Sequence, residues 1–401
     1  ATIEEGYGIN LVPLATFAME HYADDPCEEF MPKTNGGSAD IDDKTRRLTA
    51  QMHKAITVIQ FKTEAEVIKR HPEWGMADRL LLEHIDYGRG VCNIDGREYK
   101  MKSCVFPTVS PEDPYRLTPE EKTLIGRLRH SFTVNEKLHK HIRIMLGHGS
   151  LYNIINDNLL FHASVPLNAD GSLKDVELYN GMKFKGRELM NRIDRVIRSA
   201  FQNDTEPQDK LFATDYFLYL WCGRDSVLFD KSKMATFERY FLSDKSTFKE
   251  EKGNYFKLRD DEKICDLILD AFGVTGGNRH IINGHVPVHA ASGENPIKAN
   301  GKLMVIDGGF SQAYHAETGI AGYTLVYHSR GFQLVQHEPF TSTEDAILRG
   351  SDIKSTTQIV EMSTHRMLVA DTDIGKELKK QIADLEKLLY AYRHGFIKER
   401  R

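Results

Sequence analysis

Several features are scarce in this sequence, and each absence narrows what the chain can be. Five cysteines are widely scattered and form no Cys-x-x-Cys pair, which argues against a disulfide framework or a thiolate zinc site and favours a reducing, cytoplasmic compartment. No apolar run approaches the roughly 18 residues of a membrane-spanning helix, so we expect no membrane association. Basic residues are not in surplus, because 53 Lys and Arg stand against 58 Asp and Glu. We therefore expect no nucleic-acid partner.

The composition that remains is that of a folded globular protein. Hydrophobic residues make up 40% of the 401 residues and charged residues 28%, and we find neither low-complexity tracts nor an internal repeat. These values argue against intrinsic disorder. At about 100–200 residues per domain, the length predicts two or three domains.

Residues 1–149 are predicted to be mostly helical, as an insertion or cap-like region. Apolar residues recur at helical spacing from Leu48 to Ile59 and predict a helix that stops before Pro72. The segment Thr118-Pro119-Glu120-Glu121 predicts a helix start, with Thr as the cap and Glu three residues later. Between these helices, the Asp95-Gly96 turn indicates a short hairpin. This region carries no evident chemistry.

Residues 150–340 are predicted to form an α/β core, and residues 341–401 a C-terminal extension. Short apolar strands end at residues 155, 161, 282 and 306, and helices separate them. Strands interleaved with helices indicate a layered α/β fold. In the extension, residues 373–392 are predicted to form a long helix with one apolar side. We expect that side to pack on its own domain, although it could instead pair with another subunit.

Three of the predicted strands end in residues that can carry chemistry. His162 follows one apolar strand, Gly284-His285 a second, and Asp307-Gly308-Gly309 a third. Ligands of α/β sheets bind beyond the carboxyl ends of strands, and an imidazole there can hold a transition metal or a phosphate oxygen. A lone strand-end histidine is more often structural. Two such histidines together point to a site without deciding its chemistry.

Longer segments of the sequence show a family resemblance. The strand-end segments at residues 161–164, 284–287 and 306–309 resemble the final two metal motifs of calcineurin-like metallophosphoesterases. The chain from Glu5 to its C-terminus is similar to the class III fructose-1,6-bisphosphatases of bacteria, through the strings at residues 10–22, 220–226, 233–241 and 293–302.

This resemblance implies a fold and an activity. The fold would be α/β, part of a layered metallophosphoesterase sandwich plus the mostly helical N-terminal region. The enzyme would use two divalent ions, Mn²⁺ or else Mg²⁺, to activate a water that attacks phosphorus in line. Fructose 1,6-bisphosphate would lose its 1-phosphate and give fructose 6-phosphate for gluconeogenesis.

The resemblance also assigns roles to individual residues. His162 and His285 would be metal ligands, and Asp307 would orient a ligand histidine. Arg224 and Lys298 would contact substrate phosphate, although Arg224 could equally be an ordinary ion-pairing residue and Lys298 a solvated lysine. No residue of this chain is assigned as the catalytic acid or base.

The sequence departs from the family pattern in one respect. The early metal motifs Asp-x-His, Gly-Asp-x-x-Asp-Arg and Gly-Asn-His-Asp do not occur in it, and two neutral histidines cannot hold a two-metal centre without carboxylates. We therefore expect the chain to be the C-terminal portion of the enzyme, inactive alone, with the motifs upstream of Ala1. It could form a homo-oligomer or co-purify with an N-terminal fragment. The alternatives are a metallophosphatase for another phosphorylated small molecule and a non-catalytic module that binds a sugar phosphate or nucleotide.

Overall fold

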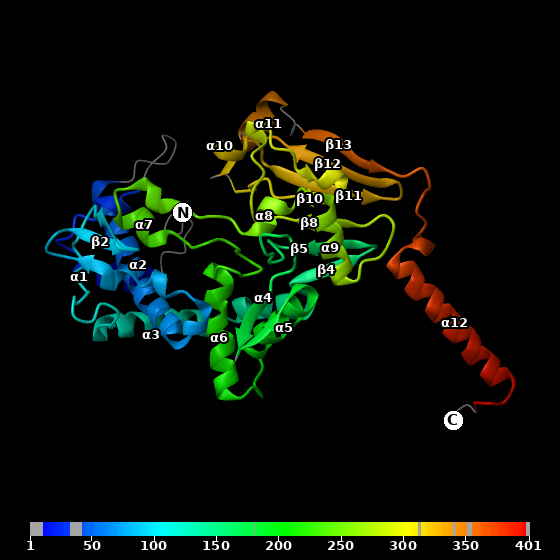
Figure 1. The fold of residues 1–401 in the computed structure, drawn as a ribbon, viewed down its shortest axis with the longest axis horizontal. Helices are drawn as coiled ribbons and strands as arrows, with labels where there is room; N and C mark the ends of the chain where they lie inside the picture. The colour runs from blue at the N-terminus through cyan, green and yellow to red at the C-terminus, as the bar shows by residue number, and fades with distance from the viewer. Residues whose placement is uncertain are drawn as a thin grey trace. The chain divides into compact units, whose positions relative to one another are not determined.

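The computed structural model describes residues 11–32, 42–179, 181–311, 314–339, 342–350 and 355–397 (Figure 1). Two compact units divide the chain. Unit 1 comprises Ala1–Ser150, Glu177–Lys183 and Ile193–Gly253, and unit 2 comprises Leu151–Val176, Phe184–Arg192 and Asn254–Arg401. Unit 1 thus extends beyond the predicted 1–149 region, and unit 2 includes the predicted extension. Asn10, which begins the first string of the family resemblance, lies outside the described residues.

Unit 1 is mostly helical, and capping interactions mark the starts of some of its helices. Its elements include α1 (Val12–His21), α2 (Asp43–Arg70), α3 (Pro119–Thr133), α4 (Glu136–His148), α6 (Pro207–Cys222), α7 (Thr236–Phe241) and a small antiparallel sheet of β1 (Ile85–Asp86), β2 (Val91–Ile94) and β3 (Arg97–Lys100). The predicted capping box is confirmed, because the Thr118 hydroxyl accepts from the Glu121 amide while the Glu121 carboxylate accepts from the Thr118 amide. The helix before Pro72 and the hairpin at Asp95-Gly96 are also confirmed.

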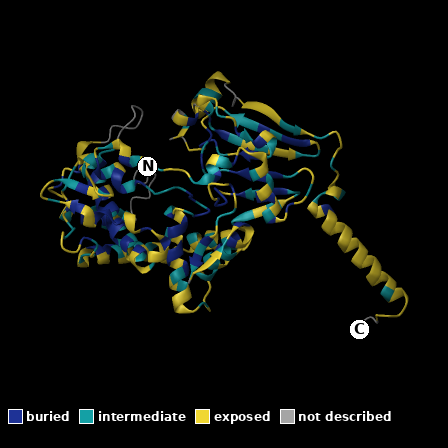
Figure 2. Cartoon of the chain, viewed as in Figure 1, coloured by how far each residue is buried: buried dark blue, intermediate teal, exposed yellow. Residues whose placement is uncertain are grey.

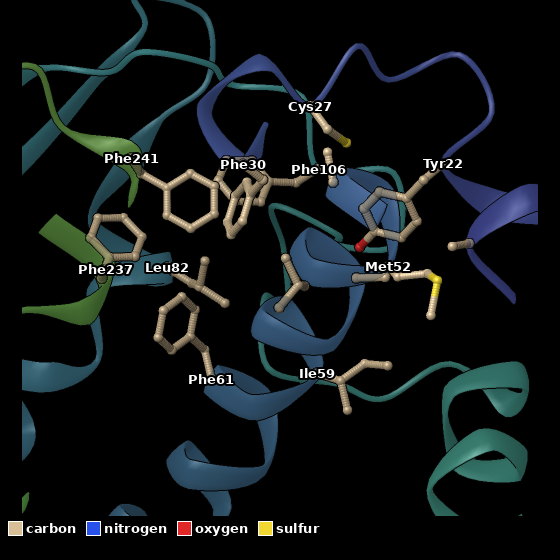
Figure 3. Packing of buried hydrophobic residues seen from close by; sticks show 14 of the residues in the cluster. Tyr22, Cys27, Phe30, Met52, Ile59, Phe61, Leu82, Phe106, Phe237 and Phe241 are labelled. Atoms are coloured by element: carbon tan, nitrogen blue, oxygen red, sulfur yellow. The ribbon is translucent and has the colours of Figure 1, made fainter. Parts of the chain in front are cut away.

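The core of unit 1 is built around α2. Aromatic side chains gather on it from segments far apart in the sequence, including Phe30, Phe61, Phe106 and Phe241 (Figure 3). Their burial is the main source of stability, at about 25 cal/mol per Å² of apolar surface removed from water. Buried charged groups in unit 1 are matched by opposite charges, as where the ammonium of Lys54 lies 2.7 Å from both Asp25 and Glu29.

Unit 2 contains a five-stranded mixed sheet that carries the predicted strand-end residues. Its order is β4 (Tyr152–Ile155), β5 (Asn158–Phe161), β8 (His280–Asn283), β10 (Leu303–Val305) and β9 (Ile297–Lys298). The three central strands are parallel, and both edge strands are antiparallel to their neighbours. The strands predicted in these segments are confirmed.

A second sheet and a helix cover this mixed sheet. The antiparallel sheet of β11 (Gly322–His328), β12 (Gly331–His337) and β13 (Ser355–Met362) packs on one face, where Ile282 and Met304 contact Phe332. Helix α9 (Glu262–Phe272) packs beside β8 with Ile268 and Leu269 buried, and it ends at Gly273. Unit 2 is therefore a layered, mixed α/β structure, in which β11 and β12 form a hairpin.

The other α-helices and strands lie outside the sheets and helices described so far. They are β6 (Val176–Tyr179), β7 (Met182–Phe184), α5 (Gly186–Ser199), α8 (Asn254–Leu258), α10 (His315–Thr318), α11 (Thr343–Arg349) and α12 (Asp373–Arg393). Helix α12 confirms the long helix predicted for residues 373–392. The expectation that its apolar side packs on its own domain is wrong, because Gly375 alone is buried within α12, every residue of which is described. Among the described residues, none of the helices combines the length and apolarity needed to cross a membrane.

Candidate functional site

The candidate site lies where the parallel strands of unit 2 end. Strand β5 pairs with β8 so that Leu160 is level with Ile282, and β10 pairs with β8 so that Val305 is level with Asn283. The three strands therefore end together at one edge of the sheet. The segments that follow them carry His162, His285 and Asp307, so these three residues lie at the same edge of the sheet.

The turn that brings the two histidines together is at His285 itself. In the continued register His162 is level with Gly284, and the Gly284 amide donates to the His162 carbonyl at 2.9 Å. Because successive side chains of a strand alternate faces, an extended His285 would point away from His162. Its φ of 69° ends the extended strand and redirects the ring. The neighbouring Gly284 has no positive φ, so the turn is made by the histidine and not by the glycine.

The two imidazoles meet as potential ligands of one ion. Nε2 of His162 lies 3.1 Å from Nδ1 of His285, and the ring centroids are 5.0 Å apart. Two nitrogens each about 2.1 Å from one divalent ion stand roughly 3.0–3.4 Å apart, so the observed separation suits that arrangement. Burial lowers the pKa of His162 below its ordinary 6.5, although the nearby charge of Asp307 opposes this. A lowered pKa favours the neutral imidazole that a metal requires.

Asp307 is held by the backbone around it. Its Oδ1 accepts from the Gly309 amide at 2.9 Å, and its carbonyl accepts from the Val288 amide at 2.8 Å. This second bond ties the segment after β10 to the segment after His285. The carboxylate is thus fixed beside the histidines, where its charge acts on the pKa of His162.

Asn283 supports both histidine-bearing segments and was missed by the sequence reasoning. It is 2% exposed, and its Nδ2 donates to the Ala163 carbonyl at 3.0 Å and to the Tyr255 hydroxyl at 2.8 Å. The Asn283 side chain therefore links its own position, two residues before His285, to Ala163, which follows His162. A polar residue that ends the apolar run Ile281-Ile282 was the available signal.

The two predicted substrate contacts have partners of their own. Arg224 belongs to unit 1, where its guanidinium lies 3.8 Å from Asp78 and donates to the Ser232 carbonyl. Lys298 lies on β9 level with Leu303, the first residue of β10, whereas Asp307 follows the other end of that strand. The Lys298 ammonium donates to Glu294 at 3.1 Å.

Unit 1 contains a cavity of about 490 Å³ that the sequence reasoning also missed. At its wall, Arg70 donates two hydrogen bonds of 2.9 Å to Asp215, and His71 bridges Asp215 and Glu73. The hydrogen bonds to Asp215 raise the pKa of Arg70 and keep the guanidinium paired with that carboxylate. Glu177 and Asp209 also line the cavity. Four carboxylates line the cavity, and its one arginine is already paired with Asp215. The cavity would therefore repel a phosphate dianion and does not suit a sugar bisphosphate.

The donor set of unit 2 fits part of a metal centre. Imidazole nitrogens suit a divalent transition ion, and the geometry of His162 and His285 suits two ligands of one ion. Across the residues that the structure describes, however, no group of three or more His, Cys, Asp or Glu side chains is placed to hold a metal. Those residues therefore do not supply a complete two-ion centre, which needs several carboxylates.

Comparison with known proteins identifies the family behind this geometry. Residues 1–394 match the family model described as Firmicute fructose-1,6-bisphosphatase, so the chain belongs to that family. Among curated proteins, it is 62% identical over 400 residues to the fructose-1,6-bisphosphatase class 3 of Parabacteroides distasonis, 59% identical to that of Bacteroides fragilis and 52% identical to that of Clostridium botulinum. No solved structure matches.

Each match covers this chain fully but its relative only in part. All of this chain is aligned in each comparison, but only 60%, 60% and 59% of the three relatives. The chain thus spans about three-fifths of the length of the curated relatives that it matches.

Proposed function

We propose that this chain supplies part of the metal centre of a fructose-1,6-bisphosphatase, which hydrolyses the 1-phosphate of fructose 1,6-bisphosphate and releases fructose 6-phosphate and phosphate. The family match supports the substrate class. The observation that carries the assignment to a site is the 3.1 Å separation of the His162 and His285 nitrogens at adjoining strand ends. We place the enzyme in the cytoplasm and in gluconeogenesis.

His162 and His285 would hold one of two divalent ions, Mn²⁺ or else Mg²⁺. Such ions supply an activated water at neutral pH and neutralise charge on the phosphoryl oxygens. The protein's own contribution is positional. Burial keeps His162 neutral, the turn at His285 directs the second ring towards the first, and Asn283 holds the two segments together. Asp307 would orient a ligand histidine.

Carboxylates from outside the described residues would complete the centre. The described histidines are neutral ligands, and two divalent ions need anionic oxygen ligands to balance their charge. These ligands would come from a protein of the relatives' full length or from a fragment that co-purifies with this chain. The two packed sheets of unit 2 would then form one part of a metallophosphoesterase sandwich, with the region 1–149 as a cap.

Arg224 and Lys298 remain proposed substrate contacts. Both are cations, and a guanidinium can bind two phosphate oxygens at once. Arg224 is the better supported of the two, because its side chain is 59% exposed and its partner Asp78 is 3.8 Å away. Lys298 would first have to leave Glu294, on a side chain that is only 15% exposed.

Phosphate release tests the proposal. In a family protein of full length, His162→Ala or His285→Ala should lower kcat/KM for fructose 1,6-bisphosphate by at least about 100-fold, because each removes a metal ligand. His289→Ala is the matched control, since His289 lies four residues after His285 on an exposed position. Near-normal turnover of both ligand variants would remove the histidines from the site.

The same assay separates the alternatives. This chain alone should be inactive, and it should gain activity with the rest of a full-length relative. Hydrolysis of fructose 1,6-bisphosphate by the chain alone would show that no further ligands are needed. A full-length protein that hydrolyses other phosphate esters but not this one would overturn the substrate assignment.

A further inference from the structure

The contacts that the structure describes between helix α12 and the rest of unit 2 lie near the N-terminal end of the helix. The Asp373 amide donates to the Asn156 side chain at 2.8 Å, and the Asp373 carboxylate accepts from the Asn156 amide at 2.6 Å. Thr372 caps the helix by accepting from the Gly375 amide. These contacts join the start of α12 to the turn between β4 and β5. The remaining turns extend over about 25 Å at 1.5 Å per residue.

Apolar side chains on those turns are exposed to solvent. Figure 2 shows α12 almost wholly in the colour of exposed residues. The exposed fractions are 46% for Leu378, 56% for Ile382, 63% for Leu385, 49% for Leu389 and 46% for Tyr392. A contiguous apolar stripe of this kind on an otherwise polar helix marks an interaction surface.

The spacing of the stripe is that of a coiled coil. The five residues Leu378, Ile382, Leu385, Leu389 and Tyr392 follow one another at intervals of four, three, four and three. This period of 3.5 residues aligns a seam for a second helix, and the exposed Ile374 and Leu388 widen the seam on its g side. Leu378, Leu385 and Tyr392 occupy the d positions of the heptad, and Ile382 and Leu389 the a positions.

Charges beside the seam favour a particular orientation. The e positions hold Lys379, Glu386 and Arg393. Ion pairs within the helix lie on its outer side, as between Lys387 and Asp384. Glu386 forms no ion pair with any described residue, and Lys379 uses one of its three donors on the Ala370 carbonyl at 2.9 Å. Both e-position charges can therefore still meet a partner.

We propose that two copies of this chain associate through an antiparallel coiled coil of α12, in which Ile382 faces Leu385 of the second copy and Leu378 faces Leu389. In this register Lys379 of each copy lies beside Glu386 of the other, which gives two opposite-charge contacts related by symmetry. A parallel pair would instead set Lys379 beside Ile374 and Glu386 beside Gln381, with no charge complementarity. The stripe is therefore complementary to itself in the antiparallel orientation.

Sedimentation equilibrium of this chain tests the surface. The wild-type chain should dimerise in a concentration-dependent way below about 500 µM. Leu385→Lys should abolish dimerisation, and Lys380→Glu, a charge change on the outer side, should not. Circular dichroism checks that each variant stays folded. A wild-type chain that is monomeric throughout, as when α12 serves another partner, would overturn the proposal, and so would a dimer that Leu385→Lys leaves intact.

Charge reversal tests the orientation. Glu386→Lys should weaken dimerisation by roughly 10- to 30-fold, because two attractive contacts become repulsive. Lys379→Glu combined with Glu386→Lys should restore it to within about threefold, since the contacts are then re-formed with exchanged signs. If the double variant dimerises no better than Glu386→Lys alone, the antiparallel register is wrong.

Discussion

The buried pair of Lys62 and Glu121 gives a sharp test of how unit 1 is stabilised. Both side chains are fully buried, and the Lys62 ammonium donates to the two Glu121 carboxylate oxygens at 2.8 and 2.9 Å and to the Thr108 carbonyl at 2.6 Å. Glu121 also accepts from the Thr118 amide at the start of α3. The pair thus joins α2 to the cap of α3, with both charged groups buried.

Removing both partners together should cost less than the sum of the two single losses. Lys62→Met leaves an unpaired buried carboxylate, and Glu121→Gln an unpaired buried ammonium, each of which should lower the free energy of unfolding by about 3–5 kcal/mol. For a unit of this size that corresponds to a fall in Tm of roughly 6–20 °C. The double variant should lose less than the sum of the single losses by about 2–4 kcal/mol, because neither charge is then stranded.

Tryptophan fluorescence can follow this unit selectively during urea unfolding. The chain has two tryptophans, Trp74 and Trp221, and both belong to unit 1. Lys44→Met is the control, since it makes the same change at an exposed position of α2 and should shift stability by less than about 0.5 kcal/mol. Additive losses in the double variant would refute the reasoning, because they would mean that each charge is stabilised independently of the other.

Three further outcomes follow from other parts of the chain. Asn283→Ala should lower the stability of unit 2 by about 2–4 kcal/mol in chemical denaturation followed by circular dichroism. Tyr255→Phe should lower it by less, because the first change removes two buried hydrogen bonds and the second removes one. Equal losses would contradict this. Burial lowers the pKa of His280 below 6.5, so the stability of unit 2 should fall as the pH drops through and below 6.5. The variant His280→Asn should flatten this pH dependence. An unchanged slope would exclude His280 as the source of the pH dependence. Burial raises the pKa of four thiols to about 12, those of Cys27, Cys92, Cys222 and Cys265. At pH 8 a thiol reagent should therefore modify at most Cys104 in the folded chain. A second fast-reacting thiol would contradict the burial.

Local signals in the sequence predicted individual elements well. The Thr118 capping box and the cap residues of α9 fixed helix ends because those interactions are made within a few residues. The edge shared by His162, His285 and Asp307 was predictable because strand ends in an α/β sheet gather on one side. In contrast, the role of Asn283 depends on Tyr255 and on Ala163, which lies 120 residues away, and no local pattern encodes such a contact.

The apolar side of α12 shows a different limit of the sequence. Its periodicity correctly predicted a long amphipathic helix, but an apolar stripe does not specify what covers it. The period of 3.5 residues from Leu378 to Tyr392 was the distinguishing signal, since packing on one's own domain does not require it. Exposure of those side chains is what turns the pattern into evidence for an intermolecular surface.

His285 is where local preference and the candidate site conflict. A side chain other than glycine at a φ of 69° costs on the order of 1–2 kcal/mol, and Gly284, which could adopt that conformation freely, stands next to it without doing so. An extended backbone at residue 285 would satisfy local preference, but the alternation of side chains would then direct the imidazole to the face opposite His162. The left-handed conformation allows two neighbouring parallel strands to direct their histidines to one point, 3.1 Å apart. In this conformation the two rings come within hydrogen-bond distance of each other, and the metal centre proposed above would use the same arrangement.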